Sequence, residues 1–355
     1  MYNSSQNTLN PKKIMANQSI CILPELKTTG GPSSFQSKLK AGLAVLGVET
    51  HHDISRKDTR ALLITGATRD LGALMEARQR SIRIVQRLDG MNWLHKKRAT
   101  GLKHYLRSER MNIQLALIRR FFADSIVYQS EFTQRWWNRI YGEIKKPASV
   151  IYNAVDLKTF SPSGRSSLSN KNVRIVVVEG SFKGGHERDL LNAADFAKRL
   201  SILLLRKVEL MIAGNVPENL KSLIPEDDSF MVNWLGVIPH EQIPELDRSA
   251  HLFFTAEINA ACPNSVVEAL ACGLPVVGYA TGSIPELVGD NGGVVRPYGS
   301  DHWKLDIPES EELVTASANV LANLLQFQKS ARERAEALFD LDQMVEAYRK
   351  ILLSS

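Results

Sequence analysis

Short apolar runs alternate with longer amphipathic segments through the first half of the chain. The runs lie at residues 20–23, 62–65, 82–86, 125–129 and 149–152. A strand followed by a helix, repeated in this way, is typical of a parallel sheet with helices on both faces. The first half is therefore predicted to form a Rossmann-like domain.

A second series of apolar runs follows a polar segment, SPSGRSSLSNKN at residues 161–172, whose composition indicates a linker. These runs lie at residues 174–178, 208–213, 230–234, 252–255, 275–278 and 293–295. A chain of 355 residues also exceeds what one core usually holds. The fold class expected is α/β, with two doubly wound Rossmann-like domains facing across a cleft.

Four segments are expected along the chain. Residues 1–17 are rich in Asn, Ser and Gln and are predicted to be a disordered arm. Residues 18–165 and 166–335 would form the two domains, and an amphipathic helix at 336–355 could cross back to the first. Ligands of open parallel sheets bind beyond the carboxyl ends of the strands, so the site is expected in the cleft.

The stretch at residues 263–293, PNSVVEALACGLPVVGYATGSIPELVGDNGG, carries the strongest local signals. It predicts a helix, a glycine stop, a buried strand, a second helix start and a glycine turn. Asn264 or Ser265 is expected to cap the first helix, whose free amides would attract an anion. Ser283 and Glu286 have the spacing of a capping box at the second helix.

Composition narrows the class of protein. Apolar and charged fractions of 44% and 23% are those of a soluble globular protein. The three cysteines, Cys21, Cys262 and Cys272, neither pair evenly nor have metal-ligand spacing, which favours a reducing compartment and packing roles. His95, His186 and His240 lack metal-ligand spacing, and none of the eight histidines is assigned a role. No apolar run approaches the roughly 18 residues of a spanning helix, and the polar first residues do not resemble a signal peptide, so a cytoplasmic protein is expected.

The net charge of +6 hides an asymmetry between the two halves. Residues 1–150 carry 25 Lys and Arg against 11 Asp and Glu, whereas the remainder carries 19 against 27. Basic residues are densest between Arg78 and Arg120, and they include Lys96, Lys97, Arg98, Lys103, Arg107 and Arg110. Such a face attracts anionic lipid, a phosphorylated acceptor or nucleic acid; a solvated helix face is the alternative. Nucleic acid is not expected, because no recognition motif or aromatic platform accompanies the charge.

Four segments, taken together, resemble one known family. VIYNAVDLKTF at 150–160 looks like a hinge-proximal signature, and TTGGPSSFQSKLKAGLAVLG at 28–47 is similar to a Gly-Gly loop and first helix. Residues 234–246 and 263–293 match the second domain in order and spacing. The family is glycosyltransferase family 4. The resemblance implies a GT-B fold, a nucleotide-diphosphate sugar donor, retention of anomeric configuration, and neither a metal nor another cofactor.

The resemblance also implies a donor site at the start of the helix after Pro263. Glu268 would accept hydrogen bonds from ribose hydroxyls, a task that suits a carboxylate. Asn264, Ser265, Val266 and Val267 would direct backbone amides at the sugar and the diphosphate. Taken without the resemblance, an ordinary helix start with a Glu favoured by the helix dipole explains the same residues.

Phosphate contacts are expected from two further places. Lys183, in GSFKGGHE, fits a clamp on the diphosphate leaving group, which gains charge as the glycosidic bond breaks. A flexible surface lysine is the alternative. Gly30 and Gly31 would allow the backbone to approach a phosphate closely.

The acceptor side is expected near Arg87 and Asp89, in QRLDG. In the family a polar residue near the position of Asp89 lies beside the acceptor hydroxyl, which makes Asp89, with Lys183, a catalytic candidate. Arg87 could steer a phosphate of the acceptor. An Asp before a Gly is, however, also a common turn former.

Two departures from the family pattern leave alternatives open. The family has two Glu residues separated by seven others, and counting back from Glu268 places Ala260 where the first Glu belongs, with Glu257 three residues earlier. The second departure is that no Arg precedes Lys183. The expected function is transfer of a sugar to a hydroxyl acceptor in surface polysaccharide or glycolipid synthesis. An anionic or lipid-linked acceptor and a peripheral contact with anionic membrane would fit the basic half. The alternatives are a non-catalytic nucleotide-sugar-binding relative and a sugar-nucleotide epimerase.

Overall fold

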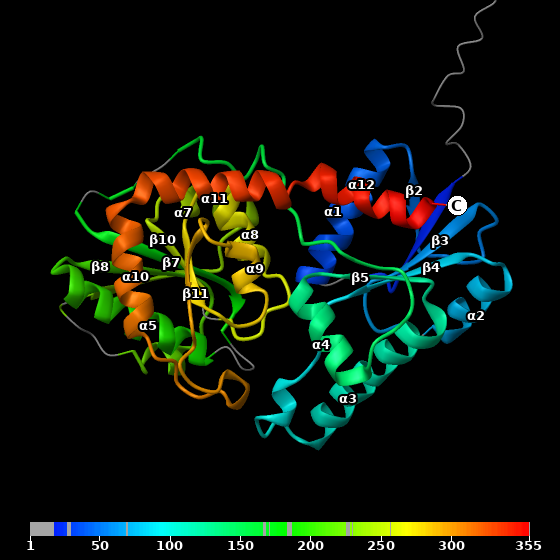
Figure 1. Ribbon diagram of the computed structural model, residues 1–355, viewed down its shortest axis with the longest axis horizontal. Coiled ribbons are helices and arrows are strands. Elements are labelled where there is room, and N and C mark those ends of the chain that lie inside the picture. Colours follow the sequence, from blue (N-terminus) through cyan, green and yellow to red (C-terminus); the bar gives the residue numbers. More distant parts are fainter. Residues whose placement is uncertain are drawn as a thin grey trace, which may run out of the picture.

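The computed structural model describes residues 18–26, 30–68, 70–165, 168–169, 171–182, 187–224, 228, 230–255 and 257–354. They form two parallel six-stranded sheets, each covered by helices on both faces (Figure 1). The two sheets follow one another along the longest axis, the first coloured blue to cyan and the second green to yellow. This arrangement confirms the predicted α/β class with two doubly wound domains.

The first sheet has the strand order β2-β1-β3-β4-β5-β6, with parallel pairing throughout. Its strands are β1 (Ser19–Leu23), β2 (Glu49–His51), β3 (Thr59–Ile64), β4 (Arg83–Leu88), β5 (Ser125–Tyr128) and β6 (Ala148–Val150). All five strands expected from apolar runs are present. The pattern could not indicate β2, because its three polar residues form a partly exposed edge.

Helices cover both faces of this sheet. They are α1 (Gly31–Val45), α2 (Leu71–Gln79), α3 (Leu102–Leu117) and α4 (Glu131–Tyr141), with short turns η2 (Leu94–Lys96) and η3 (Ile118–Phe122). The C-terminal helix α12 (Leu341–Leu353) packs beside α1 on one face. A Cβ at Gly42 would lie 2.4 Å from Val345 Cγ2, so glycine permits this close approach of the two helices.

The second sheet has the order β12-β11-β10-β7-β8-β9 and is also parallel. Its strands are β7 (Val173–Ser181), β8 (Val208–Asn215), β9 (Phe230–Gly236), β10 (Leu252–Thr255), β11 (Val276–Tyr279) and β12 (Gly293–Arg296), matching all six expected runs. Its helices are α5 (Glu187–Leu204), α6 (Glu218–Lys221), α7 (Ile243–Arg248), α8 (Asn264–Ala271), α9 (Ile284–Val288), α10 (Glu311–Ala322) and α11 (Leu324–Leu338), with short turns η4 (His240–Gln242) and η5 (His302–Lys304).

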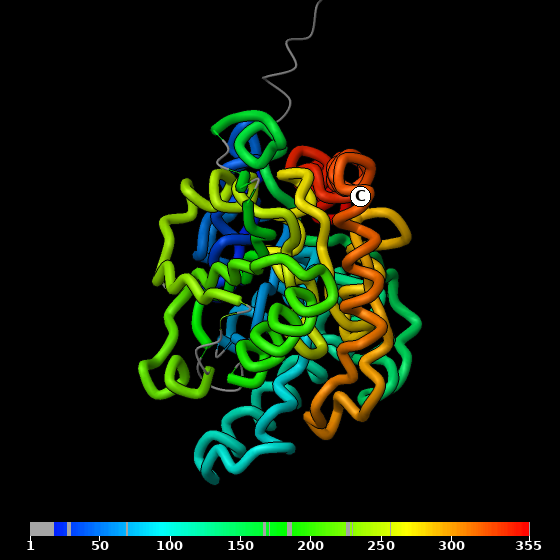
Figure 2. Tube along the Cα trace, turned by 90° about the vertical axis from the view of Figure 1, so that its left-hand side faces the viewer, coloured from blue at the N-terminus to red at the C-terminus, as the bar shows by residue number. Residues whose placement is uncertain are grey.

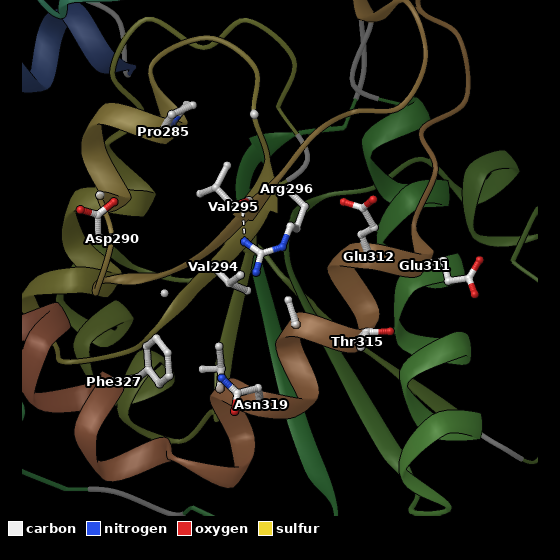
Figure 3. A pocket seen from close by; sticks show the side chains of 15 residues that line it. Pro285, Asp290, Val294, Val295, Arg296, Glu311, Glu312, Thr315, Asn319 and Phe327 are labelled. Atoms are coloured by element: carbon white, nitrogen blue, oxygen red, sulfur yellow. Dashed lines mark hydrogen bonds between the residues drawn. The ribbon is translucent and has the colours of Figure 1, made fainter.

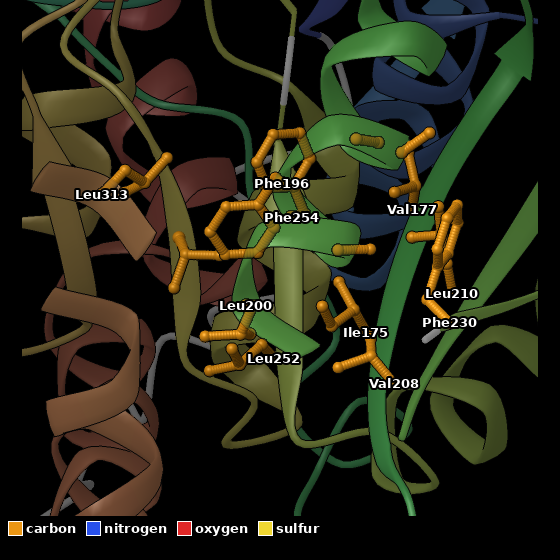
Figure 4. Close-up of a cluster of buried hydrophobic side chains, with 14 of the residues drawn as sticks. Ile175, Val177, Phe196, Leu200, Val208, Leu210, Phe230, Leu252, Phe254 and Leu313 are labelled. Carbon is orange, nitrogen blue, oxygen red and sulfur yellow. The ribbon is translucent and has the colours of Figure 1, made fainter. Parts of the chain in front are cut away.

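One face of the second sheet is covered by α5 and α10, which bury a large aromatic and aliphatic cluster (Figure 4). Phe196 of α5 stacks on Phe254 of β10 with ring centroids 4.7 Å apart and an angle of 28° between the planes. Both rings are fully buried. Because burial of aromatic surface is the largest single contribution a side chain makes to a core, this pair anchors α5 to the sheet.

The strand order reverses at β7, which lies between β8 and β10. A crevice opens at such a reversal beyond the carboxyl ends of the strands, because the following connections leave in opposite directions. Figure 2, turned by 90°, shows the second domain in front and the cyan segment with α3 projecting beyond it at the bottom. Among the described residues, no helix has the length and apolar character that crossing a bilayer requires.

Glu286 of α9 joins the two domains. Its carboxylate accepts hydrogen bonds from the backbone amides of Glu131 and Phe132, each at 2.8 Å, at the first turn of α4. The Tyr152 hydroxyl donates to the same carboxylate at 3.1 Å. The predicted capping box with Ser283 is therefore wrong: Ser283 makes no side-chain cap, and Glu286 is used across the cleft instead.

Further contacts hold the domains in this arrangement. Arg98 pairs with Glu187 at 2.7 Å. At the same end of the cleft, Trp303 of η5 packs against Trp93 and Trp136 of the first domain, with centroids 5.2 and 5.3 Å away. The domains therefore contact one another through charged, polar and aromatic side chains.

Replacement of Phe254 by Ala should lower the free energy of unfolding by about 3–5 kcal/mol, because it removes a fully buried ring and leaves a cavity. Urea unfolding followed by circular dichroism measures the change. Leu325→Ala, at a position that is 83% exposed, is the matched control and should change stability by less than about 0.5 kcal/mol. Equal effects of the two substitutions would contradict the assignment of this core.

Replacement of Glu286 by Gln should loosen the contact between the domains, because it removes the charge and one of the two acceptor oxygens that α4 and Tyr152 share. Small-angle X-ray scattering should then report a larger mean radius of gyration. Glu143→Gln, an exposed position on the first domain, is the control. A radius equal to that of the unmodified protein would show that Glu286 does not hold the closed arrangement.

Candidate functional site

A cavity of about 580 Å³ lies between the domains, a volume in the range of small-molecule sites. Both sheets contribute the segments that follow the carboxyl ends of their strands. The first domain supplies Gly30, Gly31, Pro32, Ser34, Asp89, Gln129 and Asn153; the second supplies Val178, Glu179, Gly180, His240, Glu257, Ala261, Cys262, Pro263, Asn264, Ser265 and Glu268. The structure thus brings together the predicted glycine pair, Asp89 and the start of α8.

The start of α8 faces this cavity with Pro263, Asn264 and Ser265. Pro263 is the N-cap residue and no side chain caps the helix, so the expected cap by Asn264 or Ser265 is not formed. The first-turn amides therefore remain available to an anion. Val266 and Val267 have buried side chains that pack in the core, and the Val267 amide donates to the Pro263 carbonyl at 3.4 Å.

Glu268 lies one turn further along α8 and is 5% exposed. Its Oε1 lies 2.8 Å from His240 Nε2 and 3.9 Å from Lys38 Nζ, the latter on α1 of the opposite domain. The hydrogen bond to Glu268 raises the pKa of His240 above its ordinary value. Desolvation lowers the pKa of the Lys38 ammonium, and Glu268 opposes that change. The sequence assigned no role to His240 or Lys38, because their contact with Glu268 spans distant segments.

Asp89 lies on the opposite wall. Its Oδ1 accepts a hydrogen bond from Gln129 Nε2 at 2.6 Å and another from the Arg87 guanidinium. Trp137 Nε1 donates to the Asp89 carbonyl at 2.8 Å, which fixes the backbone. Burial raises the pKa of the Asp89 carboxyl, and Arg87 opposes this effect.

Arg87 does not line the cavity. Its side chain is 1% exposed, its guanidinium lies 3.9 Å from the centroid of the Phe35 ring, and it donates to Asn153 Oδ1 at 2.9 Å. The Arg87 guanidinium is therefore too buried to contact an acceptor phosphate directly, contrary to the expectation from the sequence. Arg87 instead fixes Asp89 and Asn153, and the Asn153 amide side chain donates across the cleft to the Cys262 carbonyl at 2.7 Å.

Ala260 stands at the position where the family resemblance would place a Glu. Ala260 is buried, and its carbonyl accepts the Ser283 amide at 2.9 Å. Glu257, however, lines the cavity although its spacing from Glu268 is three residues longer than the family pattern. An acidic residue of this segment therefore borders the cavity. Lys183 lies outside the described residues.

Cys262 lines the cavity, but burial raises the pKa of its thiol to about 12, which disfavours a thiolate. Within the described ranges, no group of three or more His, Cys, Asp and Glu residues is arranged to hold a metal ion.

A larger hollow of about 890 Å³ lies at the outer edge of the second sheet (Figure 3). It is bounded by β12, α9, α10 and α11, and the Arg296 side chain points into it. The Arg296 guanidinium donates to the Val295 carbonyl at 3.0 Å. None of the site residues expected from the sequence lines this hollow, so the cavity between the domains is the better candidate for function.

Parts of this chain are similar in sequence to known proteins. Residues 164–335, just under half of it, match the family Glycosyl transferases group 1. The O-antigen chain mannosyltransferase B of Escherichia coli is 32% identical over 100 residues, which cover 27% of this chain and 26% of that protein. The D-inositol 3-phosphate glycosyltransferase of Mycolicibacterium gilvum is 27% identical over 202 residues, 53% of this chain and 44% of that protein. The chain thus spans less than half the length of these relatives.

Similarity of fold extends over nearly the whole chain. The sucrose-phosphate synthase from Thermosynechococcus elongatus superposes with a TM-score of 0.70 at 14% identity, covering 96% of this chain and all of that one. HepE from Anabaena, in complex with UDP and glucose, gives 0.66 at 16% identity over 95% of this chain and all of that one. The chain therefore has the GT-B fold, and its residues 164–335 are similar to the group 1 glycosyl transferases.

Proposed function

We propose that the protein transfers a glycosyl group from a nucleotide-diphosphate sugar to a hydroxyl acceptor. The observation that carries the proposal is the cavity between the domains, in which the open start of α8 and the Glu268 carboxylate face the Gly30-Gly31 turn. The segment that supplies α8 lies within the family match, and the similar HepE holds UDP and glucose.

The donor would lie mainly against the second domain. The diphosphate suits the α8 amides, since the helix N-terminus carries a partial positive charge, and the turn at Gly30 and Gly31 leaves room for close approach. Ribose hydroxyls suit Glu268, because an ionised carboxylate accepts two hydrogen bonds. Lys183 is proposed as an additional cation at the diphosphate.

The acceptor hydroxyl would lie near Asp89, which orients it toward the anomeric carbon. In the proposed retaining, family 4 type reaction, the bond from the anomeric carbon to the phosphate oxygen breaks while the acceptor oxygen bonds to the same face. The leaving phosphate takes the acceptor proton. The protein then contributes orientation and electrostatic stabilisation of the leaving group, without any requirement for a metal.

The closed arrangement supports transfer over hydrolysis. The contacts made by Glu286, by Arg98 with Glu187 and by Trp303 hold the domains together around the cavity. Exclusion of water protects an activated sugar from hydrolysis.

Ala260 favours one alternative, a relative that binds a nucleotide sugar without transferring it. The family carboxylate that it replaces lies near the transferred sugar. The position of Glu257 in the cavity favours the enzyme, because it supplies an acid group from the same segment. Turnover across a panel of acceptors separates the two functions.

A lipid-linked acceptor and a peripheral contact with anionic membrane fit the surface of α3. Leu102, Leu106, Ile113 and Leu117 are exposed, and their spacing places them in one stripe of the helix. Exposed basic residues accompany the stripe: Lys103, Arg107, Arg110 and Arg120. An apolar stripe with basic neighbours is typical of helices that lie on anionic bilayers, and synthesis of a surface polysaccharide or glycolipid would place the acceptor there.

Thermal-shift screening with UDP, GDP, ADP and their sugars tests the donor site, since a ligand that binds only the folded state raises the melting temperature. Glu268→Ala should reduce donor affinity at least about tenfold, because it removes an ionised hydrogen-bond acceptor. Glu333→Ala, an exposed change on α11, should leave the shift unchanged. A folded Glu268→Ala protein that shifts like the unmodified one would refute the donor-site assignment.

Flotation with liposomes tests the membrane contact. The protein should bind vesicles that contain anionic lipid more than neutral vesicles at low salt. Leu106→Ser should lower the partition coefficient about tenfold, because an exposed leucine on α3 no longer enters the bilayer interface. Leu325→Ser, on the second domain, is the control. No preference for anionic vesicles would remove the support for this partner.

A further inference from the structure

Side chains from both domains converge on one oxygen of Glu268. His240 Nε2 lies 2.8 Å from Oε1, and Lys38 Nζ lies 3.9 Å from the same oxygen. Among the described residues, none donates a hydrogen bond to the second oxygen, Oε2. The carboxylate is therefore held at one oxygen and open at the other, on the wall of the cavity.

The two holding side chains are themselves anchored to the segment that joins the domains. The His240 ring packs against Phe160 with centroids 5.2 Å apart. Lys38 donates to the Ala154 carbonyl at 2.9 Å. Because each side chain has this second contact, its position relative to Glu268 is set by the connection between the domains.

We propose that His240 and Lys38 are positioning residues, which hold Oε1 of Glu268 so that Oε2 is presented to the ribose of a nucleotide sugar. The proposal rests on the donor site described above. Lys38 belongs to α1 of the first domain, whereas Glu268 and His240 belong to the second. Binding of the donor and closure of the domains therefore stabilise one another through this carboxylate.

Burial explains why the Glu268 carboxylate needs polar partners. Glu268 is almost fully buried, and a buried carboxylate without partners loses its hydration with no compensation. The charged groups that act on His240 are Glu268, Glu241 and Lys38. Glu268 and Glu241 favour its protonated form, while Lys38 opposes it.

Isothermal titration of the 355-residue chain with UDP-glucose, or with GDP-mannose if that sugar gives the larger thermal shift, measures the effect. His240→Ala and Lys38→Met should each lower affinity, the former about tenfold because it removes a hydrogen bond to a charged group. His240→Gln and Lys38→Arg keep a donor and should recover most of the loss. Gln242→Ala and Lys40→Met, neighbours whose side chains do not contact Glu268, are matched controls.

The double variant His240→Ala with Lys38→Met adds a second readout. If both side chains act through one carboxylate, their effects on affinity should not be additive. Strict additivity would show that each acts independently and would overturn the shared role.

The pH profile distinguishes positioning from a merely structural role. The pKa of His240 lies above its ordinary value, so the imidazolium and its charged hydrogen bond to Glu268 are lost as pH rises through that raised pKa. Donor affinity should therefore fall as the pH rises above the ordinary histidine range in the unmodified protein. His240→Gln cannot titrate and should show a flat profile.

The outcomes separate this inference from the proposed function. If Glu268→Ala loses affinity but folded His240→Ala and Lys38→Met bind like the unmodified protein, the positioning role is wrong and the donor site stands. If the unmodified protein binds no nucleotide sugar, the proposed function fails and the positioning role with it. A weakened His240→Ala that His240→Gln restores would establish the role.

Discussion

The parallel direction of every strand is the constraint on which the rest of this molecule depends. All carboxyl ends of a parallel sheet meet at one edge, so the connections that leave them gather there. In this chain the two such edges face one another. The Gly30-Gly31 turn, Asp89, Glu257 and the start of α8 are far apart in sequence, yet all lie on one cavity for this reason.

The walls of that cavity are held by polar groups that would be costly to bury alone. Arg87 is buried together with the acceptors Asp89 and Asn153, and Glu268 is buried together with His240 and Lys38. Each charge is tolerable because its partner is in place before a ligand arrives. Such preorganisation fits the proposed transfer, in which the protein orients two substrates rather than supplying a strong acid or base.

The same residues couple the site to the arrangement of the domains. Asn153 donates to the Cys262 carbonyl, Glu286 accepts from the first turn of α4, and Lys38 reaches the carboxylate on α8. Separation of the domains would break these contacts together and would expose polar groups that are now paired. Occupation of the cavity and closure of the domains are therefore expected to depend on one another.

The pattern of apolar runs was sufficient to predict most of the strands and the class of fold. Eleven apolar runs became strands, and most of these strands are buried between two layers of helices, which leaves a continuous hydrophobic signature. Among the strands that the structure describes, only β2 was not predicted, since a partly exposed edge of three polar residues has no such signature. The start of α8 could also be expected, because a helix start is encoded within a few neighbouring residues, whereas Glu268 was singled out through the family resemblance.

Contacts between distant segments could not be read in the same way. The use of Glu286 across the cleft, the burial of Arg87 and the approach of His240 and Lys38 to Glu268 each join residues separated by at least 28 positions or lying in different domains. Periodicity and capping rules describe interactions over one or two turns, whereas these pairings follow from how two sheets pack against each other. The chain's residues specify the walls of the site, and the packing of its domains determines which side chains meet there.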